Sequence, residues 1–150
     1  MPTPELNQVF ARQVILPNVG VEGQQKLASS TLFLAGEGTA FQSAATALAS
    51  VGVSRILALN PAGFDPSSLS SPHPDFKAEA LSPSLPVLPA ASLYLVVTER
   101  DGFRRELSRR LKRVSRPSLF GWCAGSGYAL FLTRHRGGCP CLECFEVLNP

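Results

Sequence analysis

The stretch Leu32–Phe41, LFLAGEGTAF, decides how this sequence is interpreted. It begins as a buried strand and runs into Gly36-Glu37-Gly38. Glycines at such a turn let the backbone approach a phosphate, and amides of the following helix point at the anion. Phe41, however, stands where the third glycine of G-x-G-x-x-G would fall, and it would weaken close packing of helix on strand. Because a lone G-x-G is weak evidence, these residues alone favour a tight turn that binds nothing.

The segments around this turn predict a βαβ unit. Thr31–Ala35 is a short apolar strand, and Ala40–Val51 is an alanine-rich segment with apolar residues at helical spacing. Gly52 is a plausible C-terminal cap, and Ser54–Leu59 reads as the next strand. Strand, turn, helix and strand in this order predict parallel strands with a right-handed connection.

The later part of the chain repeats this alternation. Asp101–Val114 is expected to be a helix with an apolar stripe toward the core and its arginines on the other face. The fold class is therefore α/β, with a Rossmann-like, mostly parallel sheet and flanking helices. The further strands are expected at Leu93–Val97, Ser118–Trp122 and Tyr128–Thr133.

Two regions are less regular, although residues 1–150 are expected to form one domain. Residues 1–30 look like a helical arm, with a short helix at Gly23–Leu27. Residues 61–89 hold most of the prolines and read as a long loop, with a short helix at Asp75–Leu81. A loop of this length in a compact domain is either functional or poorly ordered.

Composition excludes several classes of protein. A hydrophobic content of 45%, a charged content of 17% and a mean hydropathy of +0.11 are typical of a globular chain. No apolar run is long enough to span a membrane, and the N-terminus does not resemble a secretory signal, so a cytoplasmic location is expected. The net charge of +3 does not by itself imply a nucleic-acid partner. The arginines between Arg100 and Arg116 are better interpreted as a solvated helix face.

The cysteines near the C-terminus form a candidate metal site at residues 139–144. Cys141 and Cys144 have the spacing of half a zinc knuckle, and two such thiolates can point at one tetrahedral metal. Cys139 and His135 are the nearest further ligands, but the set is incomplete. A free dithiol and a remnant knuckle that no longer binds metal are the alternatives.

Two polar residues follow predicted strands. Asn60 stands where a nucleotide-binding fold usually has a ribose-binding acid, and it would bind a hydroxyl without charge. Glu99 follows the third strand, where residues line the ligand crevice of open α/β sheets. It is a candidate contact for a metal or nucleotide, and a surface glutamate is the alternative.

Taken together, the motifs resemble the ThiF/MoeB/HesA family of the ubiquitin-activating-enzyme superfamily. The R-Q-x-x-L-P-x-x-G-x-x-G-Q-x-x-L arm at Arg12–Leu27 is the most specific part. The segments that follow it in the family's order are TLFLAGEG, ALASVGVSRILALN, FKAEAL, LYLVVTERD and PCLEC.

The resemblance implies that ATP and magnesium bind and that the C-terminal glycine of a ubiquitin-like or sulfur-carrier protein is adenylated. By this resemblance, Arg12 reaches a nucleotide across a dimer, and Gly36 and Gly38 form the phosphate turn. Lys77 corresponds to the lysine that contacts the phosphates, and Glu99 to the aspartate that serves the magnesium-bound nucleotide. Cys141 and Cys144 correspond to the first half of the family's zinc knuckle.

The sequence also departs from the family's pattern. The third glycine is Phe41, the ribose acid is Asn60, and Ala62 replaces a second acid. FDPSSLSSPH at residues 64–73 lacks the family's asparagine and arginine. Two interpretations follow: an ATP-dependent activating enzyme that is impaired in this chain, and a non-catalytic relative that acts as a dimer subunit or as a scaffold for a carrier protein.

Overall fold

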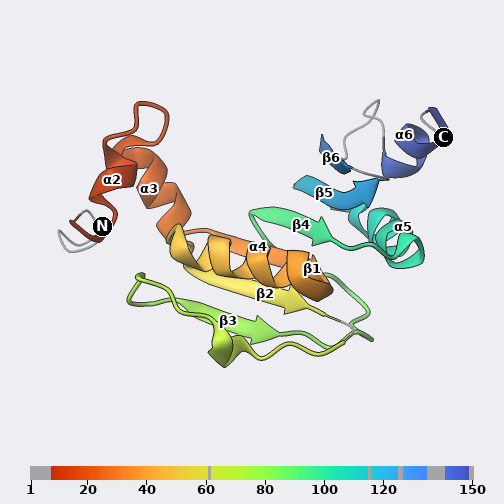
Figure 1. Cartoon of the computed structure of the whole chain (residues 1–150), viewed down its shortest axis with the longest axis horizontal. Coiled ribbons are helices and arrows are strands. Elements are labelled where there is room, and N and C mark those ends of the chain that lie inside the picture. The colour runs from red at the N-terminus through yellow and green to blue at the C-terminus, as the bar shows by residue number, and fades with distance from the viewer. Residues whose placement is uncertain (1–7, 61, 115, 125–126, 135–140, 149–150) are drawn as a thin grey trace.

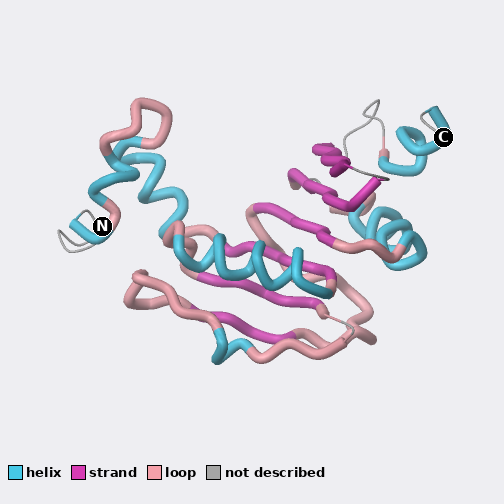
Figure 2. Tube along the Cα trace, viewed as in Figure 1, coloured by secondary structure: helices cyan, strands magenta, loops and turns pink. Residues whose placement is uncertain are grey.

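A computed structural model describes residues 8–60, 62–114, 116–124, 127–134 and 141–148. In these residues one six-stranded sheet has the order β3-β2-β1-β4-β5-β6 (Figures 1 and 2). Every neighbouring pair is parallel except β5 and β6, which are antiparallel. The expected α/β class with a mostly parallel sheet is thereby confirmed. The strands are β1 Thr31–Gly36, β2 Arg55–Leu59, β3 Lys77–Ala80, β4 Leu93–Val97, β5 Pro117–Ala124 and β6 Gly127–Arg134.

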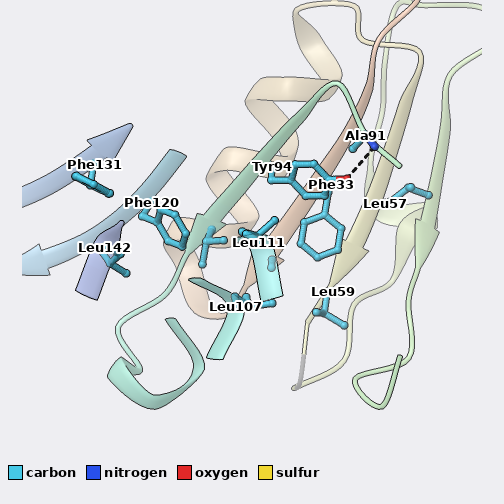
Figure 3. Packing of buried hydrophobic residues seen from close by; sticks show 12 residues of the cluster. Phe33, Leu57, Leu59, Ala91, Tyr94, Leu107, Leu111, Phe120, Phe131 and Leu142 are labelled. Atoms are coloured by element: carbon cyan, nitrogen blue, oxygen red, sulfur yellow. Dashed lines mark hydrogen bonds between the residues drawn. The ribbon is translucent and has the colours of Figure 1, made fainter. Parts of the chain in front are cut away.

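The helices pack on both faces of this sheet. Alternate residues of β1 point to opposite faces, so Leu34 belongs to the core under α4 while Phe33 belongs to the core that also includes residues of α5 and α6. Figure 3 shows the second of these cores, in which Phe33 and Tyr94 lie close to Leu107 and Leu111 of α5. The helices are α2 Ala11–Val14, α3 Gly20–Ala28, α4 Gly38–Ser50, α5 Asp101–Leu111 and α6 Leu142–Leu148, with a 3₁₀ turn at Pro66–Ser68.

The first βαβ unit has the predicted form. Phe41, Ala45 and Ala49 repeat at i, i+4 and i+8 along α4, and all three are fully buried against the sheet. The helix ends before Gly52, whose φ of +90° suits glycine, and a Cβ there would lie 2.5 Å from the Phe10 ring.

The N-terminal arm docks on the end of α4 through a few contacts. Phe10 is buried, and the amide of Gln24 donates a 3.2 Å hydrogen bond to the carbonyl of Val51. Figure 1 shows the arm beside the first residues of the strands, away from the arrowheads. The predicted helix at residues 23–27 is confirmed as part of α3.

The predicted helix at Asp75–Leu81 is wrong, because Lys77–Ala80 forms the edge strand β3. Its backbone pairs with β2: the Lys77 N–H bonds to Ser54 at 2.9 Å, and the Leu81 N–H bonds to Ala58 at 2.7 Å. A helix here would leave the edge of β2 without these partners. Residues that favour a helix locally are therefore recruited by the sheet.

The expected placement of all arginines on the solvated face of α5 is wrong for Arg104. Leu107 and Leu111 are buried as predicted, but Arg104 is also only 4% exposed. Its guanidinium lies 4.4 Å from the centre of the Trp122 ring and pairs with Asp101. A cation over an aromatic face and beside a carboxylate is stabilised away from water, which explains its burial. None of the described helices is long and apolar enough to cross a membrane.

Candidate functional site

The carboxyl ends of three parallel strands meet at one edge of the sheet. Gly36 at the end of β1 is paired with Val97 of β4, and Ala35 is paired with Leu59 of β2. The residues that follow these strands, Glu37, Asn60 and Thr98–Arg100, therefore gather at the same edge. This is the position at which open α/β sheets bind their ligands.

The two glycines of the turn have different roles. A Cβ on Gly36, where φ is +150°, would lie 1.8 Å from the Val97 carbonyl oxygen, so the close approach of β1 to β4 requires glycine. Gly38 has φ +74°, and nothing lies within 4 Å of a Cβ built on it. The turn is thus tight on the sheet side and open on the other side.

The turn leads directly into the N-terminus of α4. Glu37 is the N-cap residue, but its side chain makes no capping hydrogen bond to the first helical turn. Backbone N–H groups at such a helix end lack partners within the helix and attract anions. Together with the open side of Gly38, this backbone has the geometry of an anion-binding turn.

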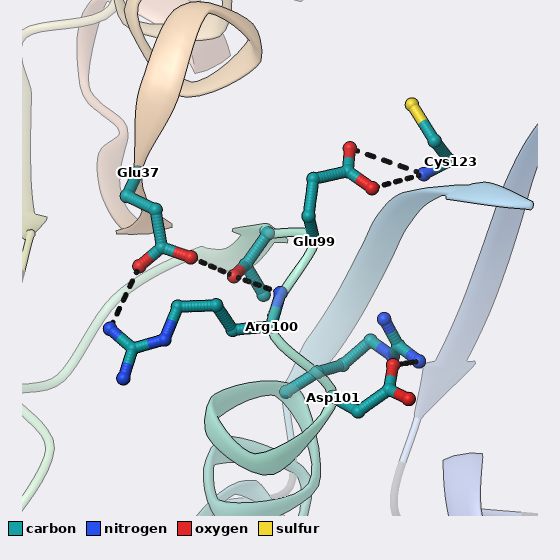
Figure 4. Close-up of polar contacts among 7 residues, drawn as sticks. Glu37, Glu99, Arg100, Asp101 and Cys123 are labelled. Carbon is teal, nitrogen blue, oxygen red and sulfur yellow. Dashed lines mark hydrogen bonds and ion pairs between the residues drawn. The ribbon is translucent and has the colours of Figure 1, made fainter.

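The side chain of Glu37 reaches across the edge to the end of β4 (Figure 4). One of its carboxylate oxygens accepts a hydrogen bond from the Thr98 hydroxyl at 2.6 Å, and the other lies 3.6 Å from an Arg100 guanidinium nitrogen. The backbone N–H of Arg100 in turn bonds to the Thr98 hydroxyl oxygen at 3.1 Å. Glu37 is largely buried, with 18% of its side chain exposed. A carboxylate is therefore held rigidly within the glycine turn.

Sequence reasoning missed this contact as a feature of the site. The available signal was the acid between Gly36 and Gly38, which is unusual in a turn expected to receive an anion. Its partners lie some sixty residues further along the chain, and only the pairing of β1 with β4 brings them together.

Phe41 does not stand in the open side of the turn. Its side chain is fully buried, and its ring packs edge-on against Phe64, with centroids 5.4 Å apart and planes at 84°. The ring fills the core between α4, the sheet and the segment after β2. The missing third glycine thus changes the helix–sheet packing and does not block the turn.

Glu99 and Asn60 reach the expected edge but are engaged elsewhere. Both carboxylate oxygens of Glu99 accept from the Cys123 N–H on β5, at 3.3 and 3.2 Å, and Figure 4 shows this side chain pointing away from Glu37. The side-chain oxygen of Asn60 accepts a 2.8 Å hydrogen bond from the Ala62 N–H, which closes a local turn.

The structure does not bring Lys77 to this edge. Lys77 begins β3 and is paired with Arg55, which is paired with Thr31 at the start of β1. It therefore lies at the level of the first residue of β1, about 16 Å along the strand from Gly36. The separation arises because Lys77 pairs in parallel with β2 at the edge of the sheet. The helix expected at Asp75–Leu81 would not have imposed this position.

Arg12 also lies away from the turn of its own chain. It is exposed on α2, in the arm beside the amino ends of the strands. In this position it lies apart from the glycine turn of its own chain, and a contact with a nucleotide across a dimer remains a prediction.

The cysteine pair is brought together on α6 and the residue before it. The sulfurs of Cys141 and Cys144 are 3.4 Å apart, while Cys139 and His135 lie outside the described residues. Within the part of the chain that the structure describes, no three His, Cys, Asp or Glu side chains are grouped to hold a metal. Zinc binding therefore stays a prediction that rests on two thiols.

The two thiol environments differ in their electrostatics. Burial raises the pKa of Cys141, but hydrogen bonds from Cys144 and the charge of Lys112 outweigh it and leave the pKa below its usual value. The Glu99 carboxylate, which hydrogen-bonds to Cys123, raises the pKa of that thiol, with burial as a smaller cause. Cys141 is therefore the more readily ionised of these two.

Comparison with known proteins identifies a shared fold through solved structures only. No known family profile matches the sequence, and no curated protein matches it. Among solved structures, E. coli MccB superposes with a TM-score of 0.67 at 13% identity, covering 98% of this chain and 52% of MccB. MccB with ATP gives 0.65 at 14% identity, covering 99% and 55%. The microcin C7 biosynthetic enzyme MccB with N-formylated MccA gives 0.65 at 14%, covering 100% and 54%.

The chain spans about half the length of the MccB chains that it matches. Because the identities are far below those of close relatives, the similarity establishes a shared three-dimensional arrangement and leaves activity open. The described sheet and its flanking helices thus have the Rossmann-like fold of MccB.

Proposed function

We propose that this chain is a non-catalytic subunit of the ThiF/MoeB type, which keeps the fold and pairs with an active homologue or holds a carrier protein. The observation that carries the proposal is the fixed carboxylate of Glu37 within the glycine turn. An adenylating site must gather positive charge around the phosphates of ATP, and this turn presents negative charge.

The backbone at the turn suits a phosphate, but the charge of the side chains around it does not. The open side of Gly38 and the uncapped start of α4 suit a phosphate. Among the described residues, Arg100 is the cation in contact with the turn, and its guanidinium already lies beside Glu37. If magnesium bound with the nucleotide, Glu37 would have to serve as its carboxylate ligand, because Glu99 is hydrogen-bonded to the backbone of Cys123.

The lost groups are sufficient to suppress turnover. Removing one preorganised charge-stabilising contact typically lowers a rate by about 10²–10³-fold. Lys77 lies at the opposite end of the sheet, and the side-chain oxygen of Asn60 is engaged by its own turn. The effects of such losses are not additive, but any one of them would make an isolated chain a slow enzyme.

An exposed apolar strand supports the role of a subunit. Tyr128, Leu130 and Leu132 alternate along the edge strand β6 and are 86%, 74% and 67% exposed. Edge strands with an apolar face tend to pair with another chain or element unless they are protected. A homodimer, a heterodimer with an active relative, or a bound carrier protein would each cover this face.

A second candidate is catalysis within an assembly. MccB has been solved with ATP and with N-formylated MccA, and the present fold is shared with it. Arg12 is exposed and lies outside its own chain's site, as a group acting on a partner's nucleotide would. In such an assembly, the partner subunit would supply the positive charge that the glycine turn of this chain lacks.

Calorimetry with ATP and magnesium, together with pyrophosphate exchange, tests the proposal. We expect the chain alone to bind ATP no more tightly than about 1 mM and to catalyse no exchange with any carrier protein. Glu37→Gln should tighten ATP binding about tenfold, because it removes one charge a few ångströms from the phosphates. The matched control is Glu22→Gln on α3, which removes a carboxylate that is 79% exposed and far from the turn.

The outcomes separate the candidates. Pyrophosphate exchange by the isolated wild-type chain would overturn the proposal. Exchange that appears only with an added homologous subunit, and that Arg12→Ala in this chain abolishes, would establish the second candidate instead. Equal ATP affinity of Glu37→Gln and Glu22→Gln would show that Glu37 does not govern the turn.

A further inference from the structure

A cavity of about 840 Å³ lies at the amino end of the sheet, opposite the glycine turn. Its walls are the first residues of β1 and β4, the segment 86–92, and the last turn of α5 with the residues that follow it. This volume is typical of ligand sites. The cavity shares no lining residue with the edge that holds Glu37.

One wall of this cavity is strongly basic. Arg109, Arg110, Arg113 and Arg116 all line it, and none of its described lining residues is acidic. Arg109 is paired with Glu143 at 2.7 Å, and Arg110 donates to the Leu85 carbonyl. Neither Arg113 nor Arg116 has an ion pair with any residue that the structure describes. Two guanidinium groups are therefore available to an external anion.

The facing wall is aliphatic. Pro86, Val87, Leu88 and Ala90 line it, and Val87 is 75% exposed. The buried hydroxyl of Tyr94 fixes this segment, since it donates to the Pro89 carbonyl at 2.7 Å and accepts from the Ala91 N–H at 3.2 Å. Because this segment is anchored, the exposed apolar side chain of Val87 is preorganised for contact with a ligand.

We propose that this cavity binds an acidic peptide segment of a partner protein in an extended conformation. Guanidinium groups bind carboxylates through two parallel hydrogen bonds. Arg113 and Arg116, which have no ion pair among the described residues, follow the last turn of α5 and are both exposed. Successive side chains of an extended peptide point to opposite sides, so its carboxylates can face the basic wall while the residues between them face Val87 and Leu88.

The cavity is less suited to a nucleotide. Base recognition outside a duplex commonly uses an exposed aromatic ring for stacking. Tyr94 is the only aromatic side chain among the described lining residues, and it is 1% exposed. This site stands independently of the function proposed for the glycine turn.

Fluorescence anisotropy with a labelled hexapeptide of alternating glutamate and leucine tests the inference on the full chain. The control peptide carries glutamine in place of glutamate, and inorganic pyrophosphate is the compact anion used as competitor. The test variant is Arg113→Gln/Arg116→Gln. A second test variant is Val87→Glu, which places a negative charge on the facing wall at an exposed position. The matched control is Arg100→Gln, which removes a charge beyond the other end of α5.

We expect the glutamate peptide to bind and the glutamine peptide not to bind. The double variant and Val87→Glu should each weaken binding at least about tenfold, while Arg100→Gln should change it less than about twofold. Absence of binding to the wild-type chain, or equal binding to the double variant, would overturn the inference. Tighter binding of pyrophosphate than of the peptide would also overturn it, because the cavity would then be a site for a compact phosphate.

Discussion

Thr98 donates its hydroxyl to the carboxylate of Glu37 over 2.6 Å, joining the end of β4 to the glycine turn after β1. The two strands already pair through their backbones, so this side-chain bond acts at the point where the sheet ends and the candidate site begins. It fixes a negative charge where an anion would otherwise approach the start of α4. The character of the site follows from this one contact.

Thr98→Val should destabilise the protein by about 1–3 kcal/mol, because the largely buried carboxylate of Glu37 loses its hydrogen-bond donor. Urea denaturation measures the change, and Thr98→Ser should keep most of the stability. Thr46→Val on the exposed face of α4 is the matched control for the shape of the side chain. Similar losses for Thr98→Val and Thr46→Val would contradict the structural importance of this bond.

Substitutions of the two turn glycines should have unequal effects. Gly36→Ala should cost more than about 3 kcal/mol or prevent folding, since its Cβ would overlap the Val97 carbonyl oxygen. Gly38→Ala should cost only about 1–2 kcal/mol, because it meets backbone strain at positive φ but has open space. Thermal denaturation of both variants checks the order, and equal losses would show that β1 and β4 are less close than described.

Phe41→Ala should cost about 3–5 kcal/mol by leaving a cavity between α4 and the sheet. Phe41→Leu should retain more than half of that stability, since it keeps most of the apolar contact. Neither variant should gain affinity for ATP in calorimetry, because the ring lies in the core beside Phe64 and not in the turn. A gain in ATP affinity on removal of the ring would show instead that Phe41 occludes the site.

Lys77→Ala should leave ATP binding and any pyrophosphate exchange unchanged, in the chain alone and in any assembly. The reason is its place at the start of β3, beside Arg55 and at the amino end of the sheet. Exchange assays with and without an added homologous subunit measure the effect. A large rate loss would mean that the segment around Lys77 adopts a different arrangement when the protein is active.

Alkylation by iodoacetamide, followed by peptide mass spectrometry, should give Cys141 a lower pH midpoint than Cys123. The thiolate is the reactive form, so a lower pKa moves the rise in rate to lower pH. Lys112→Gln should shift the Cys141 midpoint upward, since it removes a nearby positive charge. Lys26→Gln on α3 is the matched control and should shift neither midpoint. Coincident midpoints would contradict the role of Lys112 and Glu99.

Much of the fold could be predicted because periodicity is a local property. The apolar run of β1, the repeat of Phe41, Ala45 and Ala49 on α4, and the stripe of Leu107 and Leu111 on α5 each required only neighbouring residues. The position of the glycine turn followed from the same local pattern. Where the prediction was wrong, at Lys77–Ala80, helix-favouring residues were taken up by the unpaired edge of β2.

The composition of the site depended instead on residues far apart in the sequence. Glu37, Thr98 and Arg100 meet only because β1 and β4 are neighbours in the sheet, and Lys77 is separated from them only because β3 pairs in register with β2. The sequence alone determined an α/β chain with a glycine turn after its first strand. Tertiary structure decided that this turn holds a carboxylate and that the arginines gather at the opposite end, because strand pairing, and not sequence proximity, sets which side chains share a surface.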